Sequence, residues 1–426
     1  MEKADKFILE CLDCGTQYDP DRVRYLCPVC SSGNSSDQPP QGVLKTLYDY
    51  LELSRWTGKR EKRYEELKHA GFLDLLPIRS TDSLPRLRVG GTPLYPFGGF
   101  HKNAFPFRLF LKDDSQNPTF SFKDRASALV SAVAREQGME TIVAASTGNA
   151  GSSIAGMCAS QGQQAVVLVP EQAPLAKLVQ IIMYGACIVP VKGGYDDAFE
   201  LSIKATERFG WYNRNTAYNP FTIEGKKTVS FELFGQLQTR VPDRIFVPVG
   251  DGVIISGVYK GFEDLWRIGL TDRLPVIVGV QAEGSDNLAR NLTAAEFQSR
   301  PGHTLADSIA VDVPRNFLMA RHYLHRYEGE VVTVSDEAIL DASVRLAAET
   351  GIFTEPASAA AYAGMLKCFH AGMIRPGSDN VVLLTGSGLK DLKSVGDKLH
   401  LPAAIEPGID RLSEIWETYL TNRNKA

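Results

Sequence analysis

The sequence has no run of about 18 consecutive apolar residues, so it predicts no helix that crosses a membrane. Its first residues, MEKADKFILECLDC, also lack the long apolar stretch that follows a basic start in a secretion signal. An excess of positive charge is missing too, because 46 Lys and Arg residues stand against 50 Asp and Glu residues. The resulting net charge of −4 argues against binding to nucleic acid or to an acidic membrane surface. We expect a cytoplasmic protein.

Cysteine is scarce, with seven residues among 426, and a secreted disulfide scaffold would be shorter and would not leave an odd thiol. Four of the seven form two pairs near the N-terminus, in the pattern Cys11-x2-Cys14-x12-Cys27-x2-Cys30. This spacing is typical of a zinc ribbon, in which four thiolates surround one tetrahedral ion. A closed site of this kind leaves no position for a reactant, so its Zn²⁺ would be structural. The alternative is four reduced thiols in a ribbon that has lost its metal.

The length predicts about two or three domains, at ~150 residues for each. Hydrophobic residues at 44% and charged residues at 23% are ordinary values for a globular protein. Residues 1–34 would form the zinc-ribbon-like knuckle. Residues 35–90 carry many charges and a mixed helical pattern that includes Val43 to Leu53, and they predict a helical N-terminal extension.

From about residue 106, short β-branched runs alternate with helix-like stretches, which indicates an α/β fold with a mainly parallel sheet. The expected strands are Thr141–Ala145, Ala165–Val169, Cys187–Val191, Arg244–Val249, Pro275–Val280, Val331–Val334 and Val381–Leu384. In open α/β sheets the ligand sits just beyond the carboxyl ends of the strands. The turns that follow these strands are therefore where chemistry is expected.

The first candidate turn is Asn117-Pro-Thr-Phe-Ser-Phe-Lys123-Asp-Arg125, at the expected start of a helix. Lysine is the side chain that forms Schiff bases with carbonyl cofactors, and it must be desolvated or electrostatically tuned to attack as a neutral amine. A single lysine at a helix start is far more often solvated and without a chemical role. The other turns decide between these two interpretations.

Three further turns have the composition of ligand-binding loops. Ser146-Thr147-Gly148-Asn149 opens a helix, and the backbone N–H groups there suit a substrate carboxylate. Gly250-Asp251-Gly252 follows an apolar strand, and its glycines would let the backbone approach a phosphate. Thr385 ends a late buried strand, where its hydroxyl could face a pyridine nitrogen. Taken singly, the first two could equally be ordinary packing turns.

Together these motifs resemble the threonine synthase family of fold-type-II pyridoxal 5′-phosphate (PLP) enzymes. The resemblance covers about residues 90–395 and the cysteine-containing N-terminus. Its segments are NPTFSFKDR, ASTGNAG, the glycine turn after Phe246-Val-Pro-Val249, LTGSGLKD, Tyr218-Asn-Pro220, IEGKKT, GVQAEG and Glu355-Pro-Ala-Ser-Ala359. It implies a two-domain α/β fold with parallel-rich sheets. Residues 91–134 and 236–426 would form the larger, PLP-binding domain, and residues 135–235 the smaller one.

The resemblance also implies roles for single residues. Lys123 would bind the cofactor covalently and then shuttle protons. Asn149 would hydrogen-bond the phenolic oxygen of the cofactor, and Thr385 would face its pyridine nitrogen. The turn Gly250, Asp251, Gly252, Val253 and Ile254 would hold the cofactor phosphate. Ser146, Thr147 and Gly148 would bind the carboxylate of a small amino-acid substrate. The resemblance also allows a homodimer.

One segment departs from the family pattern NSxNPxR-EGQKT, whose arginine grips the phosphate of the substrate. The corresponding position here is Thr222, and threonine cannot replace the charge of a bidentate cation. Lys226 and Lys227 lie close by in the sequence and are candidates to compensate. Val253 and Ile254 also stand where the family favours glycine and asparagine.

Two reactions follow from this pattern. One is that of a threonine synthase, O-phospho-L-homoserine plus water to L-threonine plus phosphate. The other is β-replacement or β-elimination on O-phosphoserine, serine or threonine, as in a cysteate-synthase-like enzyme or an ammonia-lyase. A non-catalytic sensor is disfavoured because the lysine is intact, and a nucleic-acid binder is disfavoured because no basic patch is present.

Overall fold

The computed structural model describes residues 6–100, 103–396 and 403–425. The first five residues of the N-terminal stretch, and the parts of the expected domains at 101–102, 397–402 and 426, lie outside the described residues. The chain forms two compact units that meet in sequence between Asp391 and Leu392. None of the helices in the described part of the chain is both long and apolar enough to cross a membrane.

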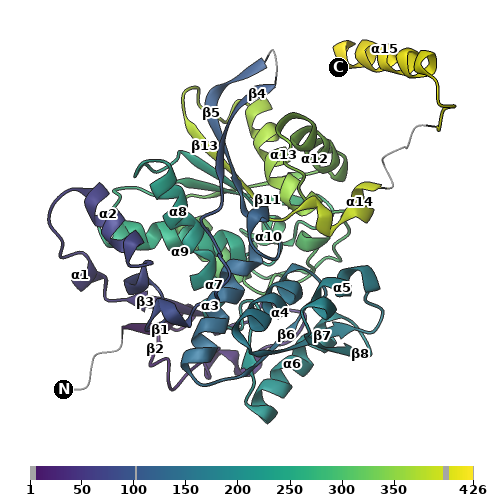
Figure 1. Cartoon of the computed structure of the whole chain (residues 1–426). Helices are drawn as coiled ribbons and strands as arrows, with labels where there is room; N and C mark the ends of the chain where they lie inside the picture. The colour runs from purple at the N-terminus through teal and green to yellow at the C-terminus, as the bar shows by residue number, and fades with distance from the viewer. Residues whose placement is uncertain (1–5, 101–102, 397–402, 426) are drawn as a thin grey trace. The chain divides into compact units, whose positions relative to one another are not determined.

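The first unit contains three sheets (Figure 1). The six-stranded sheet has the order β12 (Glu330–Val334), β11 (Val276–Ala282), β10 (Arg244–Pro248), β13 (Asp379–Leu384), β5 (Asn103–Asp113) and β4 (Leu94–Phe100). The four-stranded sheet has the order β8 (Cys187–Val191), β7 (Gln164–Pro170), β6 (Thr141–Ala145) and β9 (Tyr212–Asn213). The N-terminal sheet has the order β2 (Gln17–Tyr18), β1 (Phe7–Cys11) and β3 (Leu44–Tyr48).

Parallel pairing dominates the two larger sheets, and each predicted strand is present in them. Among the described strands of these sheets, β4 alone pairs antiparallel, with β5. The central strands are buried along their length, as β10 and β13 show, and this explains why they read as continuous apolar runs in the sequence. The prediction of an α/β fold with parallel-rich sheets is confirmed.

Helices connect and cover these strands. They are α1 (Tyr50–Leu53), α2 (Arg60–His69), α3 (Lys123–Glu136), α4 (Asn149–Gln161), α5 (Leu175–Met183), α6 (Tyr195–Phe209), α7 (Phe221–Lys226), α8 (Thr228–Gln236), α9 (Val253–Arg267), α10 (Asn287–Asn291), α11 (Phe317–Arg326), α12 (Asp336–Thr350) and α13 (Pro356–His370). The second unit contains α14 (Leu392–Gly396) and α15 (Ile409–Lys425). Figure 1 shows α4, α5 and α6 around the four-stranded sheet.

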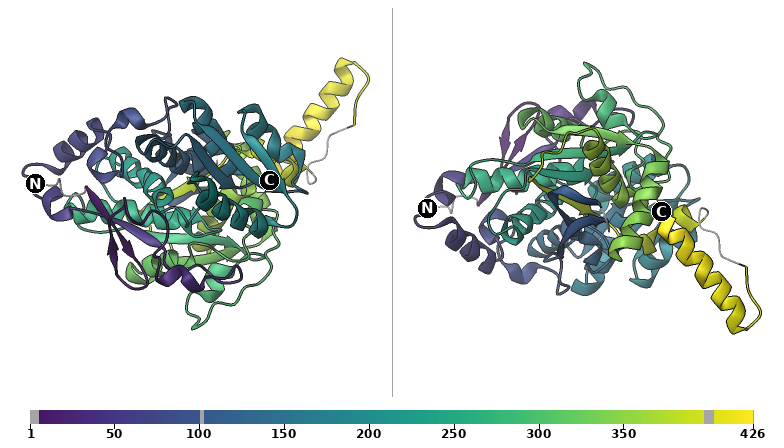
Figure 2. Two further views of the ribbon diagram at one scale, coloured as in Figure 1. Left: turned by 90° about the horizontal axis from the view of Figure 1, so that it is seen from below. Right: turned by 90° about the horizontal axis from the view of Figure 1, so that it is seen from above.

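The prediction of a helical pattern from Val43 to Leu53 is wrong for its first half. Residues Leu44–Tyr48 form strand β3, which pairs antiparallel with β1 of the knuckle. The reason is long-range pairing, because β1 offers an edge to which β3 bonds along its whole length. Lys45 on this strand pairs with Glu263 on α9 at 2.6 Å. Figure 2 shows the N-terminal strands, in purple, beside teal helices of the same unit. The domain boundaries at residues 34, 90, 134 and 235 stay predictions.

Candidate active site

Lys123 is the first residue of α3, and two hydrogen bonds fix the loop before it. The backbone N–H of Thr119 donates to Asp124 Oδ2 at 2.7 Å. The backbone N–H of Phe122 donates to the carbonyl of Thr385 at 2.8 Å. The second bond joins two turns that are far apart in the chain, so the lysine turn and the threonine turn meet at one edge of the sheet.

One cavity brings three of the four predicted turns together. The predicted residues that line it are Lys123, Gly250, Asp251, Gly252, Val253, Ile254 and Thr385. Other residues that line it include Thr216, Lys226, Ser308 and Glu355. The arrangement follows from the topology, because β5, β10 and β13 are parallel neighbours whose carboxyl ends open on the same side.

The fourth turn reaches this cavity through one residue. Ser146, Thr147 and Gly148 precede α4 and are not among the described residues that line the cavity. Asn149, the first residue of α4, is buried, and its Nδ2 donates to Glu355 Oε2 at 2.9 Å and to Ser308 Oγ at 3.4 Å. The turn is therefore linked to the cavity wall but does not form part of it.

The environment of Lys123 favours its neutral amine. Burial lowers the pKa of Lys123, the carboxylate of Glu355 opposes this, and the charge of Arg214 adds to it. A neutral lysine amine can act as a nucleophile and a base, and a lowered pKa raises its neutral fraction at any given pH. These surroundings favour the interpretation of Lys123 as a reactive amine over that of a solvated residue.

The glycine turn leaves backbone donors open for an anion. A Cβ on Gly250 would lie 3.0 Å from Ile309 Cα, and Gly252 has φ of +83° with Ala320 Cβ 2.9 Å from the corresponding position. Only glycine fits both positions without strain. Since α9 begins directly after them, its first N–H groups have no intrahelical partner and suit a phosphate. The carboxylate of Asp251 instead accepts a bond from the backbone N–H of Arg315 at 3.2 Å, which orders the turn.

A family model described as "Pyridoxal-phosphate dependent enzyme" matches residues 86–386. The threonine synthase of Methanocaldococcus jannaschii is 35% identical over 409 residues, which cover 95% of this chain and 98% of that protein. The threonine synthase of Methanosarcina acetivorans is 34% identical, with the same shares covered. The chain belongs to the threonine synthase family of pyridoxal-phosphate dependent enzymes. It is a threonine synthase-like, PLP-dependent lyase.

Solved structures of the fold-type-II enzymes share this fold. The crystal structure of an O-ureido-L-serine synthase has a TM-score of 0.63 at 21% identity and covers 74% of this chain and 95% of that one. A fungal L-serine ammonia-lyase from Rhizomucor miehei has a TM-score of 0.61 at 22% identity and covers 72% and 97%. At these identities the likeness shows the fold alone, and it confirms the expected fold type.

Thr222, at the family's arginine position, lies on α7 and is fully buried. Its Oγ1 donates to the carbonyl of Asn219 at 2.9 Å, so the hydroxyl is used within its own helix turn. Thr222 is not among the described residues that line the cavity. A ligand in the cavity would therefore not contact Thr222 directly.

The two lysines after Thr222 have different surroundings. Lys227 is fully buried and pairs with Glu224 and with Asp264 Oδ2, the latter at 2.7 Å. Lys260 and the hydroxyls of Tyr48 and Tyr50 complete this network and bind the same two carboxylates. Lys226, by contrast, lines the cavity, and its Nζ has no hydrogen-bond partner among the described residues. The network around Lys227 ties the N-terminal extension to α7 and α9 through Tyr48 and Tyr50.

Two residues near the cavity were missed as functional candidates by the sequence analysis. Glu355 belongs to a family motif for which the sequence predicts no separate role. Its carboxylate accepts a hydrogen bond from Asn149 Nδ2, and the residue lines the cavity. Arg214 belongs to no motif, yet it is 1% exposed and its charge acts on Lys123. A buried arginine gives no sequence signal, because its neighbours in the chain do not reveal its burial.

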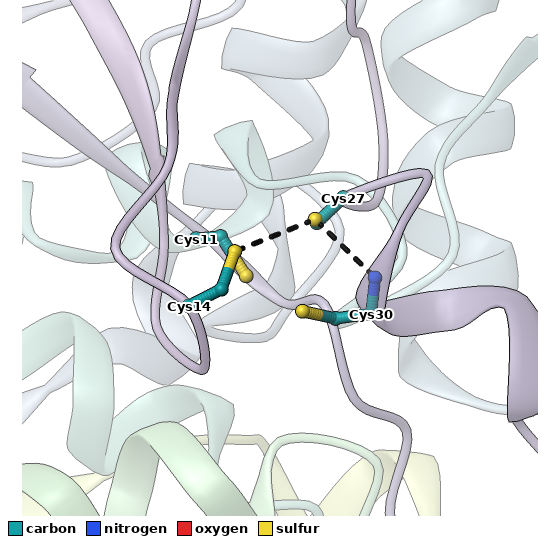
Figure 3. A group of neighbouring side chains, drawn as sticks. All are labelled: Cys11, Cys14, Cys27 and Cys30. Carbon is teal, nitrogen blue, oxygen red and sulfur yellow. Dashed lines mark hydrogen bonds between the residues drawn. The ribbon is translucent and has the colours of Figure 1, made fainter.

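The four N-terminal cysteines converge on one point (Figure 3). All four sulfur atoms lie within 4.8 Å of one another. Cys14 Sγ and Cys27 Sγ are 3.9 Å apart, and the backbone N–H of Cys30 donates to Cys27 Sγ at 3.4 Å. Thiolates around tetrahedral zinc, with bonds of ~2.3 Å, are roughly 3.8 Å apart. The donor set and its spacing fit such an ion.

Proposed function

We propose that the chain converts O-phospho-L-homoserine and water to L-threonine and phosphate, with PLP held on Lys123. The observation that carries this proposal is the cavity where Lys123, the glycine turn and Thr385 meet. The threonine synthases that match nearly the whole chain support the choice of reaction.

PLP, when bound, supplies an electron sink for negative charge that develops at the α carbon of the amino acid. Lys123 would hold the cofactor, and its amine would move protons at the α and β carbons of the substrate. The lowered pKa of its amine leaves a neutral fraction that can accept a proton. These steps need a base that sits inside the cavity, and Lys123 lines it.

The surrounding residues orient the reactants. The backbone of Gly250, Asp251, Gly252, Val253 and Ile254 would hold the cofactor phosphate at the N-terminus of α9. Thr385 would offer its hydroxyl to the pyridine nitrogen. Asn149 would donate to the phenolic oxygen, and Glu355 orients the Asn149 amide by accepting from its Nδ2. Ser146, Thr147 and Gly148 do not line the cavity themselves, but they precede Asn149, which bonds to Glu355 in the cavity wall. They would bind the carboxylate of the substrate at the N-terminus of α4.

A second candidate is β-replacement or β-elimination on O-phosphoserine, serine or threonine. The observation that favours its unphosphorylated substrates, serine and threonine, is Thr222, whose hydroxyl is bound to Asn219 and offers no charge to a substrate phosphate. The two candidates differ in the bond that breaks, at the γ carbon in the first and at the β carbon in the second.

We expect wild-type enzyme to release phosphate and form threonine from O-phosphohomoserine. The measurement compares O-phosphohomoserine, O-phosphoserine, serine and threonine, and it follows phosphate, ammonia and keto acid in each reaction. Phosphate from O-phosphoserine alone, or ammonia from serine or threonine alone, would select the second candidate. No phosphate from O-phosphohomoserine would remove the first.

We also propose that the four cysteines hold one structural Zn²⁺, which stabilises the knuckle of residues 1–34. Elemental analysis of protein purified without chelators is expected to find about one zinc per chain. A double Cys11→Ser, Cys14→Ser variant should lose the metal and become more susceptible to proteolysis within residues 1–34, while the visible absorbance of the cofactor stays unchanged. Wild-type protein without zinc would contradict the assignment.

The remaining proposals concern the state of the protein in the cell. We propose a cytoplasmic location and a homodimer, with a small amino acid as the partner and neither nucleic acid nor membrane. The net charge of −4 supports the last two points. Light scattering of the holoenzyme that gives the mass of a single chain would exclude the dimer.

A further inference from the structure

Two buried cations beside the cavity have no anionic partner among the residues that the structure describes. Lys226 and Arg214 are both 1% exposed, and neither makes an ion pair within the described part of the chain. Lys226 Nζ has no hydrogen-bond partner there, and neither has Arg214 Nη2. Other buried cations are paired, as Lys227 with Asp264 at 2.7 Å and Arg125 with Asp114 at 2.6 Å illustrate. Leaving a buried charge unpaired costs folding free energy, so the two exceptions need an explanation.

Both cations are next to the space that a substrate would occupy. Lys226 lines the cavity together with Lys123. Arg214 Nη1 donates to Thr216 Oγ1 at 3.2 Å, and Thr216 lines the same cavity. The remaining bond of the guanidinium runs from Nε to Ser127 Oγ at 3.2 Å, so both described partners are neutral hydroxyls. The charge of Arg214 is thus not cancelled by its contacts.

The pKa shifts of Lys226 and Arg214 are consistent with a site that binds an anion. Burial lowers the pKa of Lys226 well below its usual range, and the charges of Arg214 and Lys123 lower it further. Burial also lowers the pKa of Arg214 to about 10. Asp251 is the acidic group that opposes the shift at Lys226, but it is not within ion-pair distance. A ligand with two negative charges would offset the repulsion between Lys226 and Arg214.

Lys226 lies on the same helix as Thr222, the position where the family pattern has arginine. Thr222 and Lys226 are four residues apart on α7, and residues at this spacing lie one turn apart on the same helix face. Of the two, Lys226 lines the cavity and Thr222 does not, so the cationic side chain that α7 offers to the cavity is at 226.

We infer that Lys226 and Arg214 form the subsite for the distal phosphate of the substrate. The inference rests on the proposed function, and it deepens it by assigning the residues that select a phosphorylated amino acid over serine or threonine. Both are binding residues, and neither takes part in proton transfer. The phosphate of the cofactor carries the same chemistry, but the glycine turn at the start of α9 already supplies donors for that group. The substrate phosphate is therefore the ligand that lacks another site.

The test uses holoenzyme of the wild type and of the variants Lys226→Gln and Arg214→Gln, with the exposed Lys204→Gln as control. Three quantities are measured: the Kd of inorganic phosphate by calorimetry, the KM and kcat for O-phosphohomoserine, and the affinity of the apoenzyme for PLP by absorbance titration. Each of the two site variants is expected to weaken phosphate binding and raise KM by about ten- to a hundredfold. PLP affinity and the control variant should stay close to wild type.

Phosphate binding to the wild type should also weaken as pH rises, because Lys226 loses its proton below the usual lysine range while Arg214 stays charged for longer. The Lys226→Gln variant should lack that dependence. Since it removes an unpaired buried charge, its apoenzyme should melt no lower than wild type. A purely structural lysine would give a lower melting temperature.

Each outcome decides a different point. A loss of PLP affinity with unchanged phosphate binding would overturn the inference and assign the pair to the cofactor phosphate. Unchanged values in all three measurements would overturn it as well. If wild type does not turn over O-phosphohomoserine but the variants still lose phosphate binding, the subsite stands and the proposed reaction fails.

Discussion

Replacing Lys123 with alanine is expected to reduce turnover by at least roughly three orders of magnitude, because one side chain supplies both the cofactor link and the proton transfers. The visible absorbance of the purified holoenzyme should fall or shift in this variant, since the bond between the amine and the cofactor is lost. Steady-state assays with the preferred substrate, together with an absorbance spectrum, measure both effects.

The control for this variant is Lys204→Ala, because Lys204 is exposed on α6. It removes a lysine without touching the cavity and should retain both activity and spectrum. A Lys123→Ala enzyme with turnover near wild type would refute the role of Lys123, and the search for the reactive amine would move to Lys226, which lines the same cavity.

Replacing Lys227 with methionine is expected to lower the free energy of unfolding by ~3–5 kcal/mol, the usual cost of removing one partner from a buried ion pair. The change leaves Glu224 and Asp264 inside the protein with Lys260 as their only described lysine partner. At Asp264, burial favours the neutral acid, but Lys227 and Lys260 outweigh it and lower the pKa. Denaturant or thermal unfolding of apoenzyme measures the loss.

The matched control is Lys68→Met, which breaks the pair with Glu65 on the surface of α2. Both partners are largely exposed, so the expected loss is at most ~1 kcal/mol. Equal stability losses in the two variants would contradict the description of Lys227 as part of a buried network. A phosphate-binding defect in Lys227→Met without loss of stability would contradict the distinction from Lys226.

The central strands and the cavity could be predicted because local sequence determines them. Buried parallel strands are continuous apolar runs, and the turns after β10 and β13 carry the glycine and hydroxyl residues that meet Lys123. Strands β4 and β5 were not predicted. Pro96, Gly98 and Gly99 interrupt β4, and Pro106 interrupts β5, so neither resembles a regular strand in the sequence.

The distinction between Lys226 and Lys227 could not be predicted. The two lysines are adjacent and chemically identical. Because an α-helix turns by about 100° per residue, their side chains point in different directions, and Lys226 lines the cavity while Lys227 pairs with Asp264. Arg214 escaped notice for a related reason, since its importance comes from burial without a carboxylate partner. Such features depend on the packing of α3, α7 and the segment after β9, which no local pattern encodes.

The role of Lys123 is tested most directly by borohydride reduction of the holoenzyme, followed by proteolysis and mass mapping of the peptide that retains the cofactor. The reduced PLP adduct is expected on Lys123, and the Lys123→Ala variant is expected to yield no labelled peptide. A label on another lysine, or no label on the wild-type enzyme reconstituted with PLP, would contradict that role.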